Sequence, residues 1–154
     1  MITGAIDPGL TGGLAVVNDF GDCETILMPI TDDGIVDGAA VMRFFVEHGV
    51  EFVVIERTHS MPRQGVKSTF TFGFVSGQVA GVTQVMMVPH KWVRPQEWKK
   101  AWGLIKCDKD ASRDVAICTF PKAHQQFQRV KDHGRAEAAL LAAYHLGMHL
   151  REAA

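Results

Sequence analysis

The first 29 residues contain three short segments rich in apolar and β-branched side chains, each followed by a turn sequence. We predict strands over Ile2–Ile6, Gly13–Asn18 and Cys23–Pro29. The breaks between them, Asp-Pro-Gly at 7–9 and Asn-Asp-Phe-Gly at 18–21, are rich in turn-forming residues. Because breaks this short favour neighbouring antiparallel strands, we expect the chain to begin with a small antiparallel sheet.

The rest of the chain combines helical and strand-like segments. Phe52–Ile55 is a continuous β-rich run of the kind buried on both faces of a parallel sheet. Gly73, Gly77 and Gly81 recur every four residues, which favours a helix packed closely against the sheet or a second subunit, although Thr69 and nearby residues favour a strand. The order of elements predicts an α/β fold, with a mixed five-stranded sheet flanked by helices in one domain over residues 1–154. The remaining predicted elements are a strand at Val85–Val88 and helices at Ala39–Glu47, Val66–Gly81, Pro95–Trp102, Asp110–Phe120 and Gly134–Arg151.

The charges are distributed unevenly along the chain. The net charge of −1 gives no overall sign of a nucleic-acid partner. However, the charges between residues 19 and 51 are almost all acidic, whereas those between 91 and 113 are mostly basic. This pattern is compatible with a basic face that binds a polyanion. It is equally compatible with two ordinary solvated surfaces.

The cysteines and the apolar segments indicate a cellular compartment. Cys23, Cys107 and Cys118 form no CxxC pair, so we expect free thiols in a reducing environment. The apolar runs are too short to cross a bilayer, and no signal peptide is visible. We therefore expect a cytoplasmic protein without a membrane partner.

Two carboxylates follow predicted strands. Asp7 precedes Pro8 and Gly9, where a turn residue is the ordinary interpretation. Glu56 ends a buried strand, where a charge needs a partner. The adjacent Arg57 is poorly placed for that purpose, because neighbouring residues of a strand point to opposite faces. A structural salt bridge and a functional role are both open for Glu56.

A third carboxylate, Glu137, lies on the apolar face of the last predicted helix. It shares that face with Leu140 and Leu141. A carboxylate there needs a cation, a strong donor or a metal, because burying it unpaired costs several kcal/mol. Its place in the first turn of the helix contributes only about 0.3–1 kcal/mol. A metal is favoured, with Arg57 and Arg135 as alternative partners.

Asp132 and His133 come just before this helix. His133 is four residues before Glu137 and shares its face if the helix begins early, whereas Asp132 would reach the same point from a preceding turn. The carboxylates of Asp7, Glu56 and Glu137, with one further Asp or His, suit Mg²⁺ or Mn²⁺ and not zinc. Two such ions about 3.5–4 Å apart could activate a water and stabilise the leaving oxygen of a phosphodiester. The residues therefore predict a divalent-metal-dependent nuclease.

Four segments together resemble a known family. They are AIDPGLTGGLAVV at 5–17, VVIERTH at 53–59, VRPQEWKKAW at 93–102 and KDHGRAEAALLAAYH at 131–145. In this order and spacing the chain resembles the RuvC-like Holliday junction resolvases, particularly their bacteriophage-type members, in the ribonuclease-H-like superfamily. The resemblance implies a ribonuclease-H-like fold. It also implies a homodimeric endonuclease that uses Mg²⁺ or Mn²⁺, with two ions expected, to cut two strands of a four-way DNA junction symmetrically.

The resemblance also assigns site residues. Bacterial members carry Asp or His three residues before the last acid, where this chain has Gly134. The phage and organelle pattern, with its metal ligand farther upstream, points to Asp132 as the fourth ligand, with His133 close behind. The remaining matches are Asp7 on the first strand, Glu56 on the fourth strand and Glu137 on the final helix.

In the same resemblance, Val66–Gly81 is a helix near the dimer interface, preceded by a loop that reaches the junction. Phe70 is then either a wedge against an unpaired base or a core residue, whereas Phe72 and Phe74 are expected to pack in the core. The lysines of the basic segment are expected to contact phosphates. The predicted DNA contacts are Arg63, Lys67, Phe70, Lys99, Lys100, Lys106 and Lys109.

Two other functions stay open. A related nuclease could keep the fold and the metal site but act on other branched DNA, an RNA–DNA hybrid or structured RNA. A catalytically silent junction-binding protein could keep the fold alone. The complete acidic set argues against the silent protein, because such a protein has no need to retain mutually repelling carboxylates.

Overall fold

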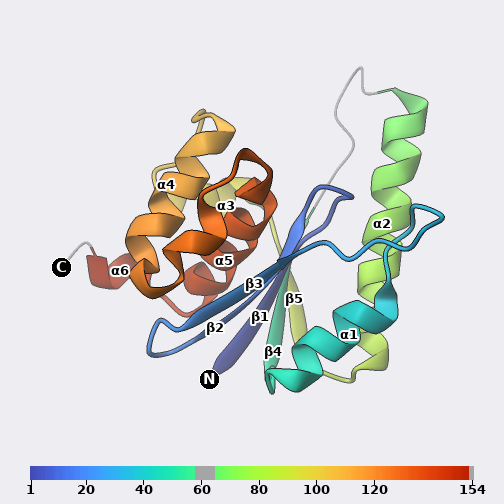
Figure 1. Ribbon diagram of the computed structural model, residues 1–154, viewed down its shortest axis with the longest axis horizontal. Helices are drawn as coiled ribbons and strands as arrows, with labels where there is room; N and C mark the ends of the chain where they lie inside the picture. The colour runs from blue at the N-terminus through green and yellow to red at the C-terminus, as the bar shows by residue number, and fades with distance from the viewer. Residues whose placement is uncertain (58–64, 153–154) are drawn as a thin grey trace.

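A sheet of five strands separates two groups of helices in the computed structural model, which describes residues 1–57 and 65–152 (Figure 1). The strand order across this sheet is β3-β2-β1-β4-β5. Strands β1, β2 and β3 pair antiparallel, whereas β4 and β5 run parallel to β1. The mixed sheet is therefore confirmed. The strands are β1 Ile2–Asp7, β2 Gly13–Asn18, β3 Cys23–Leu27, β4 Phe52–Glu56 and β5 His90–Val93.

The helices cover both faces of the sheet. Helices α1 and α2 lie on one face, and the others lie on the opposite face (Figure 1). No helix in the described part of the chain has the length and apolar character needed to cross a membrane. The helices are α1 Gly38–Glu47, α2 Val66–Val85, α3 Pro95–Ala101, α4 Lys109–Thr119, α5 His133–His145 and α6 His149–Glu152, with short 3₁₀ helices η1 Pro121–Phe127 and η2 Val130–Asp132.

The parallel pairing of β1 with β4 determines where the first two carboxylates emerge. Ile6 lies opposite Ile55, so the next residues, Asp7 and Glu56, end two adjacent strands at the same edge of the sheet. Successive side chains of a strand point to opposite faces. Asp7 therefore points to the same face as Ala5, which belongs to the core beneath α5.

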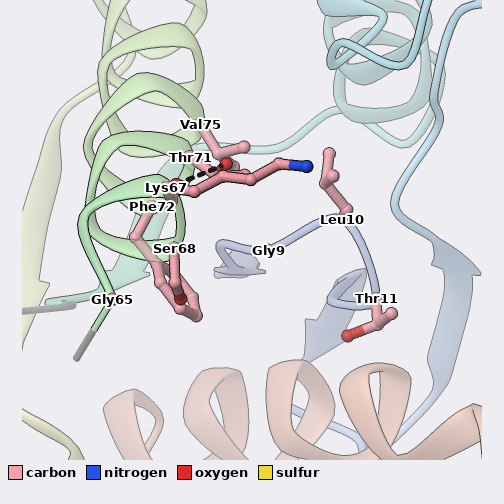
Figure 2. Close-up of a pocket in the computed structure, with 9 residues that line it drawn as sticks. All are labelled: Gly9, Leu10, Thr11, Gly65, Lys67, Ser68, Thr71, Phe72 and Val75. Atoms are coloured by element: carbon pink, nitrogen blue, oxygen red, sulfur yellow. Dashed lines mark hydrogen bonds between the residues drawn. The ribbon is translucent and has the colours of Figure 1, made fainter.

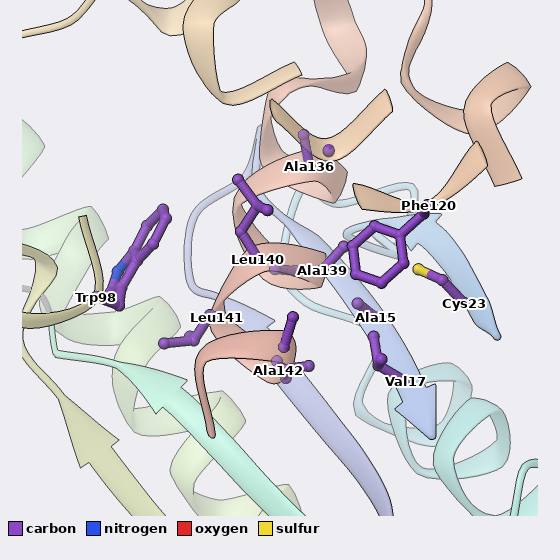
Figure 3. Close-up of a cluster of buried hydrophobic side chains, with 14 of the residues drawn as sticks. Ala15, Val17, Cys23, Trp98, Phe120, Ala136, Ala139, Leu140, Leu141 and Ala142 are labelled. Atoms are coloured by element: carbon purple, nitrogen blue, oxygen red, sulfur yellow. The ribbon is translucent and has the colours of Figure 1, made fainter. Parts of the chain in front are cut away.

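Helix α5 lies directly on the sheet because its inner face carries small side chains. Ala136, Ala139 and Ala142 are fully buried against β1 and β2, and Leu140 and Leu141 fill the space beside them (Figure 3). Alanine loses little side-chain entropy on burial and is the best helix former. The same residues therefore favour both the helix and its close packing on the sheet.

The first turn of α5 touches the backbone of the β1–β2 loop. A Cβ atom on Gly134 would lie 2.6 Å from the carbonyl carbon of Gly12, and one on Gly13 would lie 2.7 Å from the backbone nitrogen of Arg135. Gly12 and Gly134 also form an isolated β-bridge. Glycine at these positions therefore permits a backbone-to-backbone contact that no other residue allows.

Two predicted boundaries were wrong. Helix α2 continues through Val85, so the predicted strand at Val85–Val88 does not form, and the strand that pairs with β4 is His90–Val93. Burial of Val79 and Thr83 extends α2 against local propensity, until a turn in which Met87 has a φ of 56°. Pairing with β4 then selects the following residues, which local propensity alone does not reveal.

The last helix is shorter than predicted. Helix α5 ends at His145, and Gly147 with a φ of 69° separates it from α6. Glycine adopts this left-handed conformation without a Cβ clash, so it ends the helix inside the predicted range of Gly134–Arg151.

We predict that Gly134→Ala destabilises the protein by about 1–3 kcal/mol, the usual range for overpacking a close contact. Its Cβ would force α5 away from Gly12, which cannot move aside as a flexible side chain could. Urea denaturation measures the effect. Gly65→Ala is the control, because its Cβ would meet nothing within 4 Å and its φ of −62° suits alanine. Equal losses in the two variants would contradict the prediction.

Candidate metal centre

Three carboxylates from distant parts of the chain meet at one point. Asp7 ends β1, Glu56 ends β4, and Glu137 lies in the second turn of α5. One oxygen from each side chain lies within 4.8 Å of the others. The structure therefore brings together the three acids that the sequence singled out.

Two neighbouring helices supply hydrogen-bond donors to this carboxylate cluster of Asp7, Glu56 and Glu137. The indole Nε1 of Trp98, a fully buried residue of α3, donates to Glu56 Oε2 at 2.8 Å. The hydroxyl of Ser112 on α4 donates to Glu137 Oε1 at 3.2 Å. These bonds restrict the orientation of two of the carboxylates.

The remaining strong contact is an ion pair. Lys99 Nζ donates to Glu137 Oε1 at 2.8 Å, and both side chains are largely buried, with exposed fractions of 27% and 13%. Burial alone would lower the pKa of Lys99, but its hydrogen bond to Glu137 and the charges of Glu56 and Asp7 outweigh that effect and raise the pKa. Lys99 therefore stays charged beside the cluster.

The cluster is electrostatically costly. Burial raises the pKa of Asp7 well above its ordinary value, and the negative charges of Glu56 and Glu137 raise it further, against a smaller opposing effect of Lys99 and Lys109. Burial and the charge of Glu137 likewise raise the pKa of Glu56, although the Trp98 hydrogen bond opposes this. Carboxylates held this close favour a bound cation, which removes the repulsion.

The donor set fits a hard divalent cation. The three residues offer only carboxylate oxygens, which Mg²⁺ and Mn²⁺ prefer. No nitrogen or sulfur ligand joins them among the described residues, so the site does not resemble a zinc centre. Trp98 and Ser112, which sequence reasoning did not assign to the site, act through these carboxylates. The requirement of a buried indole N–H for a partner was the one local signal for Trp98.

Asp132 is not brought to the carboxylate cluster. Its side chain is fully buried, and both of its oxygens accept hydrogen bonds from Arg129. His133 begins α5 one turn before Glu137, and its Nδ1 lies 3.3 Å from the carbonyl oxygen of Val130. The predicted role of Asp132 as a ligand therefore lacks the geometric support that the other three acids have.

The predicted DNA contacts fall into three groups. Arg63 lies outside the described residues. On α2, Lys67 is exposed and Phe70 is 73% exposed, so Phe70 is not a core residue. Near the cluster, Lys99 is held by Glu137. The other three lysines are exposed on or beside α3 and α4: Lys100, Lys106 and Lys109.

The prediction that Phe72 and Phe74 pack in the core was wrong. Their side chains are 41% and 46% exposed. Val75 and Val79 take the core positions of α2 instead, because they face the sheet. Helix α2 has no charged residue after Lys67, so its sequence does not indicate which of its faces is buried.

A cavity of about 530 Å³ lies between the β1–β2 loop and the start of α2 (Figure 2). Gly9, Leu10 and Thr11 form one wall, and Lys67 extends from α2 across the cavity toward Leu10 (Figure 2). That wall begins two residues after Asp7 in the chain.

Solved structures share this arrangement of strands and helices, although no family model and no curated protein matches the sequence. Thermus thermophilus RuvC in complex with a Holliday junction substrate aligns with a TM-score of 0.69 at 20% identity, covering 99% of this chain and 96% of that one. The chain has the RuvC fold. A second structure of Thermus thermophilus RuvC gives a TM-score of 0.69 at 19% identity, over 99% and 97% of the two chains.

A eukaryotic structure agrees. The yeast mitochondrial Holliday junction resolvase Ydc2 aligns with a TM-score of 0.60 at 11% identity, over 97% of this chain and 80% of that one. The predicted ribonuclease-H-like fold is therefore confirmed.

We predict that Glu56→Gln raises the melting temperature of the metal-free protein at pH 8 by about 2–4 °C, the shift that roughly 1 kcal/mol produces in a domain of this size. The pKa of Glu56 is raised on folding. Its contribution to stability is therefore present below the unfolded pKa and is lost as the pH rises through the folded pKa. The glutamine avoids that loss and can still accept the Trp98 hydrogen bond.

Thermal unfolding in EDTA at pH 4 and pH 8 tests this, and the difference between variant and wild type should shrink at pH 4. The exposed carboxylate of Glu47 provides a matched control, since Glu47→Gln should change stability by less than about 0.5 kcal/mol. A Glu56→Gln protein that is less stable than the wild type at pH 8 would show that the cluster is not under electrostatic strain.

Proposed function

We propose that this chain is a metal-dependent endonuclease that resolves four-way DNA junctions by paired phosphodiester cleavage. The observation that carries the proposal is the cluster of Asp7, Glu56 and Glu137, whose oxygens lie within 4.8 Å of one another at the edge of the sheet. The fold supports the choice of substrate, because a similar structure, Thermus thermophilus RuvC, is bound to a Holliday junction. Other branched nucleic acids are the alternative substrates for the same site.

The residues around the cluster have distinct roles in this mechanism. Asp7, Glu56 and Glu137 would hold Mg²⁺ or Mn²⁺, which when bound supplies activation of a water and stabilisation of charge on the phosphate. Trp98 fixes one oxygen of Glu56 through its 2.8 Å hydrogen bond. Lys99 places a positive charge beside the cluster, where a phosphate oxygen can share it with Glu137.

His133 is the better placed of the two predicted fourth ligands. It lies four residues before Glu137 on one continuous helix, so the two side chains share a face. A hydrogen bond from its Nδ1 to the carbonyl of Val130 at 3.3 Å would leave Nε2 available for a metal ion, although neither ring nitrogen joins the three carboxylate oxygens that lie within 4.8 Å of one another. Asp132, by contrast, has both oxygens occupied by Arg129.

Exposed cations near the cluster would bind the DNA backbone. Lys100, Lys106 and Lys109 extend the positive charge from α3 to α4. On the other side of the cluster, Lys67 lies over the cavity beside the β1–β2 loop. Contacts of this kind contribute affinity without sequence preference and weaken as salt rises.

One face of α2 would form a homodimer interface. A Cβ atom on Gly73 or Gly77 would meet nothing within 4 Å, so this row of glycines is not needed for packing within the described chain. Phe70 and Phe74 stack beside it with ring centroids 6.2 Å apart, and both are exposed. A smooth apolar surface of this kind allows a second copy to approach closely, and two copies would place two cutting sites on one junction.

We expect Asp7→Asn, Glu56→Gln and Glu137→Gln each to abolish cleavage of a synthetic four-way junction while leaving junction binding largely intact. The substitutions remove metal ligands but no DNA contact. Cleavage assays with Mg²⁺, Mn²⁺ or EDTA, together with binding measured by gel shift, provide the test. Glu97→Gln, which removes an exposed carboxylate from the helix that carries Lys99, should retain full cleavage.

Cleavage in EDTA, or equal cleavage by the Glu56→Gln variant and the wild type, would refute the metal-nuclease proposal. Equal cutting of a linear duplex and of the four-way junction would refute the proposal that the protein is a junction resolvase. The proposal that it is a metal-dependent nuclease would remain, with a different substrate.

We also expect Gly77→Arg to convert a dimer into a monomer, because the new side chain places a charge on the apolar face of α2. Light scattering coupled to gel filtration measures the mass. Phe20→Arg is the control. It introduces the same charge at an 89% exposed residue between β2 and β3, at the other end of the sheet from Asp7. A monomeric wild type, or a dimeric Gly77→Arg variant, would refute this interface.

A further inference from the structure

Among the described residues, Asp132 is the only carboxylate residue with no solvent-exposed surface, and its contacts are with arginines. Arg129 Nη2 donates to Oδ1 at 2.9 Å, and Arg129 Nε donates to Oδ2 at 3.1 Å. The backbone N–H of Arg129 adds a third bond to Oδ2 at 2.9 Å. Arg135 Nη1 is 3.8 Å from Oδ1. A carboxylate held by a two-pronged guanidinium and a backbone donor has little capacity left for a metal ion.

These contacts keep the carboxylate charged. Burial alone would raise the pKa of Asp132, but the bonds from Arg129 and the charge of Arg135 bring it below its ordinary value. The arrangement is therefore a fully buried carboxylate whose hydrogen bonds are satisfied by a guanidinium that is 55% exposed. Loss of that partner would leave the charge of Asp132 buried without its strongest donor, which is destabilising.

The position of Asp132 connects this ion pair to the start of α5. Asp132 ends η2, and His133 is the first residue of α5. The ion pair closes the turn before the helix, so it determines where α5 begins. Glu137 follows five residues later, and its oxygen must come within 4.8 Å of those of Asp7 and Glu56.

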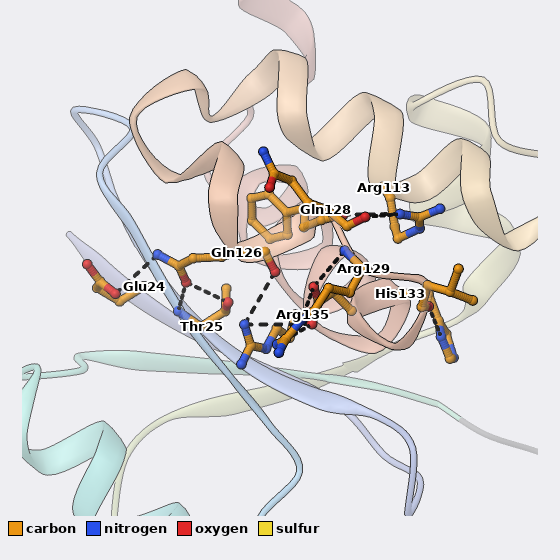
Figure 4. Close-up of polar contacts among 11 residues, drawn as sticks. Glu24, Thr25, Arg113, Gln126, Gln128, Arg129, His133 and Arg135 are labelled. Atoms are coloured by element: carbon orange, nitrogen blue, oxygen red, sulfur yellow. Dashed lines mark hydrogen bonds and ion pairs between the residues drawn. The ribbon is translucent and has the colours of Figure 1, made fainter.

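The same ion pair is also connected to β3, an outer strand of the sheet. Arg135 Nη1 donates to the carbonyl oxygen of Gln126 at 3.3 Å, and the Gln126 side chain accepts bonds from the backbone and the hydroxyl of Thr25 at 2.8 and 2.7 Å (Figure 4). The contacts of Arg135 with Asp132 and Gln126, and of Gln126 with Thr25, thus join the start of α5 to β3. Together with the contact of Gly134 on Gly12, they hold the first turn of α5 from two sides.

We infer that Asp132 is a positioning residue for this site and not a metal ligand: through Arg129 it fixes the start of α5 and thereby the placement of Glu137 and His133. The inference rests on the proposed function, since it concerns the same cluster. It also explains why an aspartate five residues before Glu137 is fully buried and contacts arginines.

Asp132→Asn, Arg129→Lys and the double variant test the inference. Asparagine can still accept the backbone bond, and lysine keeps a positive charge near Asp132, so neither single change leaves a buried charge without a cation. We expect each single variant to lower kcat for junction cleavage roughly 10- to 100-fold, as small displacements of catalytic groups do. The KM for the junction should stay about the same, because no DNA contact is lost.

The double variant should be no slower than the slower single variant, because both changes break the same ion pair. Titration calorimetry with Mn²⁺ alone should show weaker binding in both single variants, by a similar factor. Asp22→Asn is the matched control, since it breaks an exposed 3.0 Å ion pair with Lys122 of η1 that includes no residue of α5 or of the carboxylate cluster, and it should leave kcat and Mn²⁺ affinity unchanged.

Three results would overturn the inference. Mn²⁺ affinity lost in Asp132→Asn but not in Arg129→Lys would make Asp132 a ligand. A lower melting temperature with unchanged kcat and Mn²⁺ affinity would make the ion pair purely structural. A rise in KM alone in Arg129→Lys would make Arg129 a DNA contact.

The Mn²⁺ titration contains no DNA. A wild type that binds Mn²⁺ but leaves the junction intact would therefore refute the proposed substrate, and the titration of the variants would still decide the role of Asp132. A wild type that neither binds Mn²⁺ nor cleaves would overturn both proposals.

Discussion

The close contact between the β1–β2 loop and the first turn of α5 is the constraint on which the site depends. Gly134 lies against Gly12, and Gly13 against Arg135, at distances that leave no room for a Cβ atom. This contact places the start of α5 next to the end of β1, and Glu137 follows one turn later. The parallel register of β1 and β4 adds Glu56 beside Asp7. Two backbone contacts therefore assemble three carboxylates that are far apart in the chain.

The assembled cluster opposes folding, and the neighbouring helices offset part of that opposition. Burial and mutual repulsion raise the pKa values of Asp7 and Glu56. Lys99 and Trp98, adjacent residues of α3, each contact a different carboxylate at 2.8 Å. A bound divalent ion would relieve the rest of the repulsion, so metal affinity and the instability of the metal-free protein have the same origin.

The two faces of the sheet serve different purposes. On the α5 face, small and aromatic side chains fill a dense core that holds the carboxylates in place (Figure 3). On the other face, α2 buries Val75 and Val79 but leaves its phenylalanines and the row of glycines uncovered. Under the proposed function, the densely packed face would hold chemistry that tolerates little displacement, and the uncovered face of α2 would associate with a second copy.

Much of this fold follows from the sequence, because its signals are local. The first three strands and the helical nature of α5 come from residue patterns within a few positions, and Glu137 stands out as a charge on an apolar helix face. The tertiary structure alone decided the pairing of Asp132 with Arg129, the contacts of Trp98 and Lys99 with the cluster, and the end of α2 at Val85. For Asp132, an arginine and a metal ion were both possible partners. The contacts of Trp98 and Lys99 join residues about 40 positions apart in the chain. The end of α2 depends on which residues pair with β4. Local patterns identify a charge that needs a partner, but only the packed chain determines which partner it meets.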